Sequence, residues 1–219
     1  MADMRAFRDE VTDWAAGGPG EAARELAARL GVRTAVLLEG PSDLAAVETL
    51  AARRGRDLAA VETLAARRGR DLAAEGVCVV PMGGAMSVGR YASLLGPPGL
   101  ALRLAGLCDE REQPFYDRGL ERAGAPRRDF FVCVSDLEEE LIRALGPAKV
   151  EEVIRDEGDI RAWQTFLHQP AQHGRPRQQQ LRRFLGTKKG RKIRYGHLLV
   201  EALAPEQVPA PLDDLLTSL

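Results

Sequence analysis

The sequence predicts an α/β fold with a central, mainly parallel four-stranded sheet flanked by helices. Short, continuous apolar runs alternate along the chain with segments of helical periodicity, which is typical of strands joined by crossover helices. The runs show no alternation of polar and apolar residues, as expected for parallel strands buried on both faces. A chain of 219 residues is also long enough to bury a sizeable core.

The elements follow in order. Residues 4–31 are amphipathic and helical, with a break at the glycine-rich residues 17–20. We expect the four strands at residues 34–40, 76–84, 100–109 and 129–136, where apolar runs end in glycine or an acid. Helices are predicted between and after them, over residues 44–71, 87–95, 112–123 and 137–145.

The rest of the chain is helical and rich in loops. Its predicted helices cover residues 148–157, 159–167, 177–185 and 193–202, and a proline-containing segment leads into a last short helix. We therefore divide the chain into an N-terminal helical segment (1–32), an α/β domain (33–146) and a helical, basic C-terminal extension (147–219).

A tandem repeat lies between the first two strands. Residues 58–71 repeat residues 44–57 letter for letter, which indicates a recent or engineered duplication because old repeats drift. Fourteen helical residues turn through about 1400°, some 40° short of four turns, and add about 21 Å. The second copy can therefore extend one helix with its apolar stripe nearly preserved, or the glycine of either copy can break it.

Composition excludes several classes of protein. No apolar run approaches the roughly 20 residues of a membrane helix, and the charged N-terminus is no signal peptide, so we expect a cytoplasmic protein. Three cysteines without a CxxC pattern argue against a disulfide framework or a zinc site. Cys78, Cys108 and Cys133 lie in apolar strands and are predicted core residues.

The net charge of −1 conceals two oppositely charged regions. Residues 162–200 contain nine Lys and Arg but no Asp or Glu, and the remaining residues carry a net charge of −10. A solvated basic face is the plain interpretation of such a segment. A basic segment beside an acidic site is also what phosphodiester chemistry uses, because cations hold the backbone and carboxylates hold metals.

Acidic residues follow the predicted strands at their carboxyl ends, the edge where α/β sheets bind ligands. They are Glu39, with Asp43 about one helical turn later, Asp109, and Asp136 with Glu138. Each can also be an ordinary acid at a helix start. Several converging carboxylates need cations among them, and hard oxygen ligands suit Mg²⁺ or Mn²⁺.

At these residues the chain resembles the TOPRIM domain of topoisomerases, primases and OLD-family nucleases, and most closely the OLD type. The resemblance rests on the EGxxD turn at Glu39, the Gly83–Gly84 pair, Asp109, and the DLE of residues 136–138; the string GTKKGRKIRYGHLL resembles the OLD C-terminal extension. It implies a TOPRIM (Rossmann-like) fold and a DNA nuclease with two Mg²⁺ or Mn²⁺ ions. In that pattern Glu39 is general base or metal ligand, and Lys192 stabilises charge on the phosphate. The implied metal ligands are Glu39, Asp43, Asp109, Asp136 and Glu138.

The chain departs from the family pattern in two places. Arg111 stands where the family's DxD motif has its second acid, so one metal site is weakened unless Glu110 or Glu112 substitutes. No GxxxxGK[ST] phosphate loop occurs, so we expect a stand-alone TOPRIM unit, or one whose ATPase is a separate chain.

The leading hypothesis is therefore a metal-dependent DNA nuclease or nickase, and the alternative is a weakened module that binds nucleic acid or a partner ATPase without cleaving. Polymer synthesis, as in primases, is less favoured because no zinc module is apparent. With few aromatic residues for base stacking, DNA contact should be to phosphates, with little sequence specificity. The candidate nucleic-acid-binding residues are Arg182, Arg183, Lys188, Lys189, Arg191, Lys192 and Arg194. The oligomeric state is open.

Overall fold

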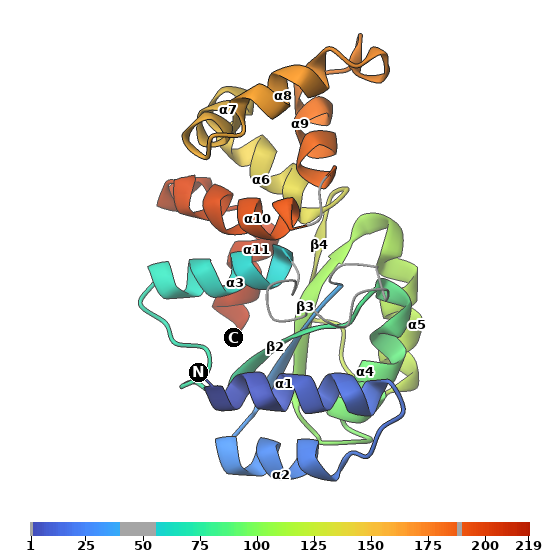
Figure 1. Cartoon of the computed structure of the whole chain (residues 1–219). Helices are drawn as coiled ribbons and strands as arrows, with labels where there is room; N and C mark the ends of the chain where they lie inside the picture. The colour runs from blue at the N-terminus through green and yellow to red at the C-terminus, as the bar shows by residue number, and fades with distance from the viewer. Residues whose placement is uncertain (1, 40–55, 188–189) are drawn as a thin grey trace.

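The computed structural model describes residues 2–39, 56–187 and 190–219 and confirms the predicted α/β class (Figure 1). Four parallel strands form one sheet in the order β2-β1-β3-β4. The strands are β1 (Thr34–Leu38), β2 (Val77–Pro81), β3 (Arg103–Asp109) and β4 (Phe130–Cys133). Each is shorter than its predicted range: β1, β2 and β4 end two or three residues earlier, whereas β3 ends at Asp109 as predicted and begins three residues later.

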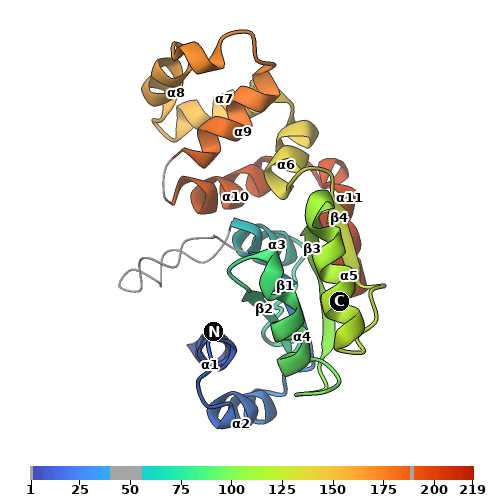
Figure 2. The same cartoon turned by 90° about the vertical axis from the view of Figure 1, so that its right-hand side faces the viewer.

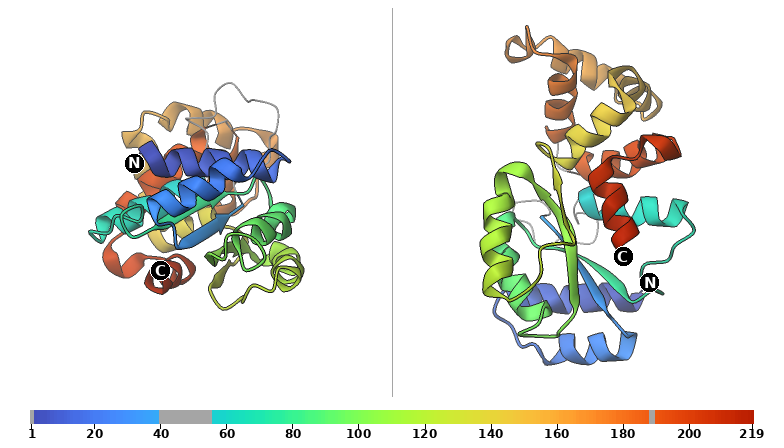
Figure 3. Two further views of the ribbon diagram at one scale, coloured as in Figure 1. Left: turned by 90° about the horizontal axis from the view of Figure 1, so that it is seen from below. Right: turned by 180° about the vertical axis from the view of Figure 1, so that it is seen from behind.

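Helices cover both faces of the sheet (Figure 3). Alternate residues of β1 point to opposite faces, so that Val36 and Leu38 join one buried cluster and Ala35 and Leu37 join another. The second cluster is completed by α1 (Ala2–Ala15), α2 (Glu21–Leu30), α4 (Val88–Leu95) and α5 (Gln113–Arg122). The first is completed in part by α3 (Arg56–Arg67), α10 (Arg191–Ala202) and α11 (Ala210–Ser218).

Four further helices extend the molecule beyond the sheet (Figure 2). They are α6 (Leu137–Leu145), α7 (Pro147–Asp156), α8 (Ile160–Leu167) and α9 (Arg177–Gly186). Trp163, Phe166 and Phe184 pack with ring centroids 5.0–5.9 Å apart, and this aromatic group belongs to the same buried cluster as α3, α10 and α11. The C-terminal segment therefore shares a core with the sheet.

The second copy of the repeat supplies most of helix α3. The helix begins at Arg56 and ends at Arg67, before Gly69 with φ +71°. Val61 and Leu64 are buried, and the Arg67 guanidinium donates to the carbonyls of Val200 and Leu203 at the end of α10. Residues 44–55 of the first copy lie outside the described part of the chain, so the structure decides neither of the two arrangements predicted for the repeat.

Two predictions from composition can be compared with the described residues. Cys78, Cys108 and Cys133 are buried thiols, as expected of core cysteines. Within the described ranges, no helix has the length and apolar character needed to cross a membrane.

Candidate metal centre

Two predicted site residues meet at the carboxyl edge of the sheet because their strands are neighbours. Strands β1 and β3 pair in parallel, with Leu37 opposite Gly106. Glu39 directly follows β1, and Asp109 is the last residue of β3. Parallel pairing therefore brings these two carboxylates to the same edge, and both side chains are half-buried.

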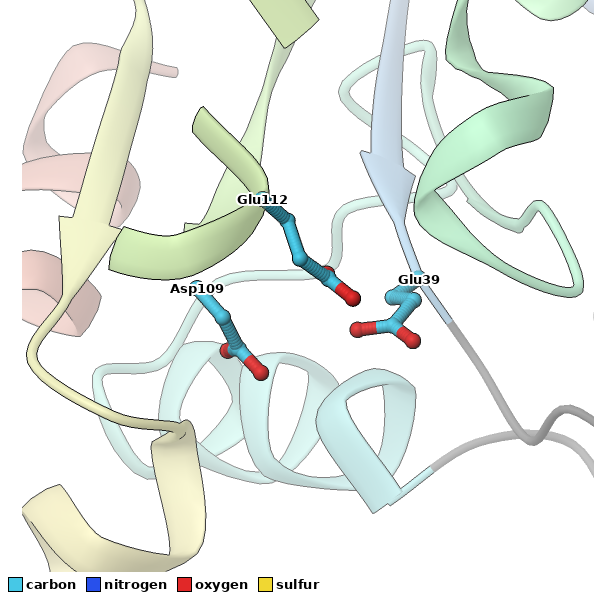
Figure 4. A group of neighbouring side chains, drawn as sticks. All are labelled: Glu39, Asp109 and Glu112. Carbon is cyan, nitrogen blue, oxygen red and sulfur yellow. The ribbon is translucent and has the colours of Figure 1, made fainter. Parts of the chain in front are cut away.

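A third carboxylate, Glu112, completes the group (Figure 4). Glu39, Asp109 and Glu112 each place an oxygen within 4.8 Å of the others. Glu112 belongs to a short 3₁₀ helix, η3 (Glu110–Glu112), which Asp109 precedes as the N-cap residue. Residues i and i+3 of a 3₁₀ helix eclipse one another, so the turn carries Glu112 back over Asp109.

The position of Glu112 explains how the chain tolerates Arg111. A DxD motif assumes an extended chain, in which residues two apart share a face. Here the strand ends at Asp109 and the spacing becomes three, so Glu112 comes to lie with the other two carboxylates while Arg111 and Glu110 remain exposed. The sequence offered both Glu110 and Glu112 as substitutes, and only the 3₁₀ turn distinguishes them.

Asp136 lies outside this carboxylate group. Strand β4 ends at Cys133 rather than at Asp136. The chain turns out of the sheet at Val134, which is exposed, and at Ser135, which has a φ of +71°. Asp136 then caps α6: its Oδ1 accepts the Glu139 N–H at 2.9 Å. Its Oδ2 accepts from Nε of Arg182, 2.7 Å away on α9, and this hydrogen bond raises the pKa of Arg182.

Glu138 is the second residue of the same helix and lies in its first turn. Its side chain is 3% exposed, and it too lies outside the group formed by Glu39, Asp109 and Glu112. The remaining predicted ligand, Asp43, falls outside the described residues. Of the five predicted metal ligands, the structure thus brings together Glu39 and Asp109, and it adds Glu112.

The basic residues predicted to bind nucleic acid have different surroundings. Arg191 is buried, donates to Thr187 Oγ1 at 2.8 Å and stacks over the Phe184 ring. Arg194 lies 2.7 Å from Asp159, whereas Arg183 is exposed and has no carboxylate partner among the described residues. Lys192 lies in the first turn of α10, and Lys188 and Lys189 fall outside the described ranges.

The carboxylate group has the donor chemistry that Mg²⁺ and Mn²⁺ prefer. All three side chains offer hard oxygen atoms, and among the residues that the structure describes no thiol or imidazole belongs to the group. Three like charges at this separation repel one another, and a divalent cation among them removes that cost. The residues present therefore fit a hard divalent ion.

The fold is similar to solved structures of one class of protein. The C-terminal region of the Burkholderia pseudomallei OLD protein matches with a TM-score of 0.58 and 20% identity, covering 85% of this chain and 96% of that one. The C-terminal region of the Xanthomonas campestris pv. campestris OLD protein matches with a TM-score of 0.57 and 22% identity, covering 85% and 91%. No family model and no curated protein matches the chain. The likeness confirms the predicted resemblance at the level of the fold.

Proposed function

We propose that the chain is a Mg²⁺- or Mn²⁺-dependent phosphodiester hydrolase that acts on DNA as a nuclease or nickase. The observation that carries the proposal is the convergence of Glu39, Asp109 and Glu112 at the ligand-binding edge of a fold similar to OLD C-terminal regions. A divalent ion bound there would offset phosphate charge and make bound water more acidic.

The residues have separate roles in this proposal. Asp109 and Glu112 hold the ion, and Glu39 either joins them or accepts the proton of the attacking water. Lys192, in the first turn of α10, stabilises negative charge on the scissile phosphate, as the family resemblance implies. The contribution of Asp43, Asp136 and Glu138 to a second ion remains part of the family-based prediction.

The first test is cleavage of supercoiled plasmid with and without Mn²⁺. Glu39→Gln and Glu112→Gln each remove a charge from the group, and we expect cleavage to fall by about 10²–10⁴-fold. The matched control is Glu110→Gln, because Glu110 is exposed in the same 3₁₀ turn and lies outside the group. Equal activity of all three variants, or of wild type without metal, would contradict the proposal.

The stoichiometry of metal binding separates one ion from two. Calorimetric titration of the apoprotein with Mn²⁺ should give two sites if Asp136 or Glu138 participates, and one if Glu39, Asp109 and Glu112 act alone. In the first case Asp136→Asn or Glu138→Gln, whichever removes the participating carboxylate, should lower the number of sites to one, and in the second case neither should change it.

The second candidate is a module that binds DNA or a separate ATPase chain without cleaving. It is favoured by the pairing of Asp136 with Arg182, which commits a predicted metal ligand to a salt bridge. This candidate predicts metal-independent, salt-sensitive DNA binding that is unchanged in Glu39→Gln. Metal-dependent cleavage by the wild type would exclude it.

A further inference from the structure

Internal ion pairs neutralise much of the basic segment. Arg177 lies 3.1 Å from Glu151, and Arg182 lies 2.6 Å from Asp136. Arg191 and Arg194 share Asp159, at 3.5 and 2.7 Å. All these carboxylates lie outside residues 162–200. The arginines of the acid-free segment are therefore paired with carboxylates from other parts of the fold. Charges already paired in this way contribute less to binding a polyanion.

His168, His173 and Arg175 of the basic segment lie at the far end of the helical part, in the connection between α8 and α9. An open cavity of about 670 Å³ lies where α8 is joined to α9. Figure 1 shows this connection at the top of the molecule. The lining of the cavity includes His168, His173, Arg175, Arg177 and Gln180, and no carboxylate of the described residues. Arg175 has no carboxylate partner within the described ranges.

Local contacts hold these side chains in place. Arg175 Nε donates to the Ala171 carbonyl at 2.7 Å, which leaves the two terminal nitrogens of its guanidinium for a ligand. Arg177 donates to Gln180 Oε1 at 3.2 Å and lies over the buried Trp163 ring, 5.6 Å from its centroid. Nδ1 of His168 lies 2.7 Å from the Gln164 carbonyl and donates to it. Donors fixed before binding lose little conformational entropy when they meet an anion.

We propose that this cavity binds phosphate groups of the DNA strand, as a second contact at a distance from the carboxylate group. The inference rests on the proposed function for the identity of the ligand. The open form and the absence of carboxylates suit a polyanionic backbone. The Trp163 ring is buried beneath Arg177, so it offers no exposed face on which a base could stack. Contact here is therefore to phosphate and independent of sequence.

The test compares two charge reversals on the same lobe. Arg175→Glu reverses a charge in the cavity wall, whereas Arg161→Glu reverses an exposed charge on α8 outside the cavity, again without a carboxylate partner in the described part of the chain. Binding of a labelled 30-base-pair duplex is measured by fluorescence anisotropy from 50 to 200 mM salt. We expect Arg175→Glu to weaken binding at least fivefold more than Arg161→Glu and to reduce the salt slope by about one.

The outcomes separate this inference from the proposed function. Equal effects of the two reversals, no effect of either, or no duplex binding by the wild type would overturn the cavity as a DNA contact. Loss of metal-dependent cleavage in Glu39→Gln, with duplex binding intact, supports the proposed function whatever Arg175→Glu does. Inorganic phosphate and a free nucleotide are added as competitors. Displacement of the duplex by millimolar nucleotide but not by equimolar phosphate would assign the cavity to nucleotides and overturn the inference.

Discussion

At the scale of single residues, secondary structure decides which acids meet. Glu39 and Asp109 could be predicted to converge, because strand ends can be recognised from apolar runs and parallel strands share an edge. Glu112 could be offered only as one of two candidates, because choosing it requires knowing that the chain turns into a 3₁₀ helix directly after Asp109. The same rule places Asp136 at the sheet edge, but strand β4 ends three residues earlier, at Cys133.

Sequence reading could not foresee the partner of Asp136. Arg182 lies 46 residues away, and it was predicted to bind nucleic acid. Only the packing of α9 on α6 brings the two together, and with them Glu139, 3.8 Å from the same guanidinium. Arg182 on α9 thus forms ion pairs with the N-cap and the first turn of α6. The Arg182 side chain therefore has a structural role in addition to any contact with DNA.

We predict that Arg182→Ala destabilises the fold by about 1–3 kcal/mol, because it leaves the buried Asp136 carboxylate without its charged donor. The Arg182 side chain is itself 44% exposed, which limits the gain from the ion pair and keeps the loss in that range. The measurement is urea unfolding at pH 7.5. Arg183→Ala is the control. Arg183 is the exposed neighbouring residue, so its substitution should change the free energy of unfolding by no more than about 0.5 kcal/mol. Equal losses in the two variants would contradict the assigned role.

At the scale of elements, most helices and strands were predictable from periodicity and from glycine and proline breaks. Helix α6 has the predicted bounds, and most others begin and end within a few residues of prediction. The predicted start of the repeat helix, at residue 44, lies outside the described residues. What could not be predicted is where the C-terminal helices pack. The apolar faces of α10 and α11 indicated burial but not their partner, which proves to be the sheet face already covered by α3.

The repeat leads to a prediction about this same face. Because the two copies are identical, removing residues 44–57 or 58–71 gives the same chain. That chain keeps Val61, Leu64 and Arg67, which make the contacts of α3, and only five residues, 39–43, then separate the end of β1 from Leu58, an ordinary length for a βα connection. We expect the shortened chain to have a Tm within about 4 °C of the full chain, because a change of 1 kcal/mol corresponds to a shift of about 2–4 °C. Differential scanning calorimetry measures it.

A core substitution made in both the full and the shortened chain tests whether the two copies of the repeat are interchangeable. Leu64→Ala should cost about 2–5 kcal/mol in the shortened chain, since Leu64 is buried. In the full chain the cost should be smaller, because residues 44–57 carry the same side chains in the same order and can replace the altered copy. Equal costs would show that only the second copy can pack on α10.

At the scale of the whole molecule, stability should fall steeply at high pH. Burial raises the pKa of the Cys108 thiol to about 11 and that of the Tyr195 hydroxyl to about 12. Cys108 lies in β3 on one face of the sheet, and Tyr195 lies in α10 on the other. Both groups therefore stay protonated in the folded chain at pH values where the unfolded chain ionises.

The direction of the effect follows from linkage. A folded-state pKa above the unfolded value contributes stability that is fully present below the unfolded value and is lost as pH rises through the folded value. The Cys108 contribution to stability is therefore lost between pH 9.0, the ordinary pKa of a thiol, and about 11. The Tyr195 contribution is lost between pH 10.0, the ordinary pKa of the hydroxyl, and about 12. Urea midpoints measured at pH 7.5, 9, 10 and 11 should be level at first and then fall. Cys108→Ala should flatten the decline between pH 9 and 11, whereas Tyr195→Phe should flatten it only above pH 10. A decline that neither variant alters would place the alkaline sensitivity in other groups.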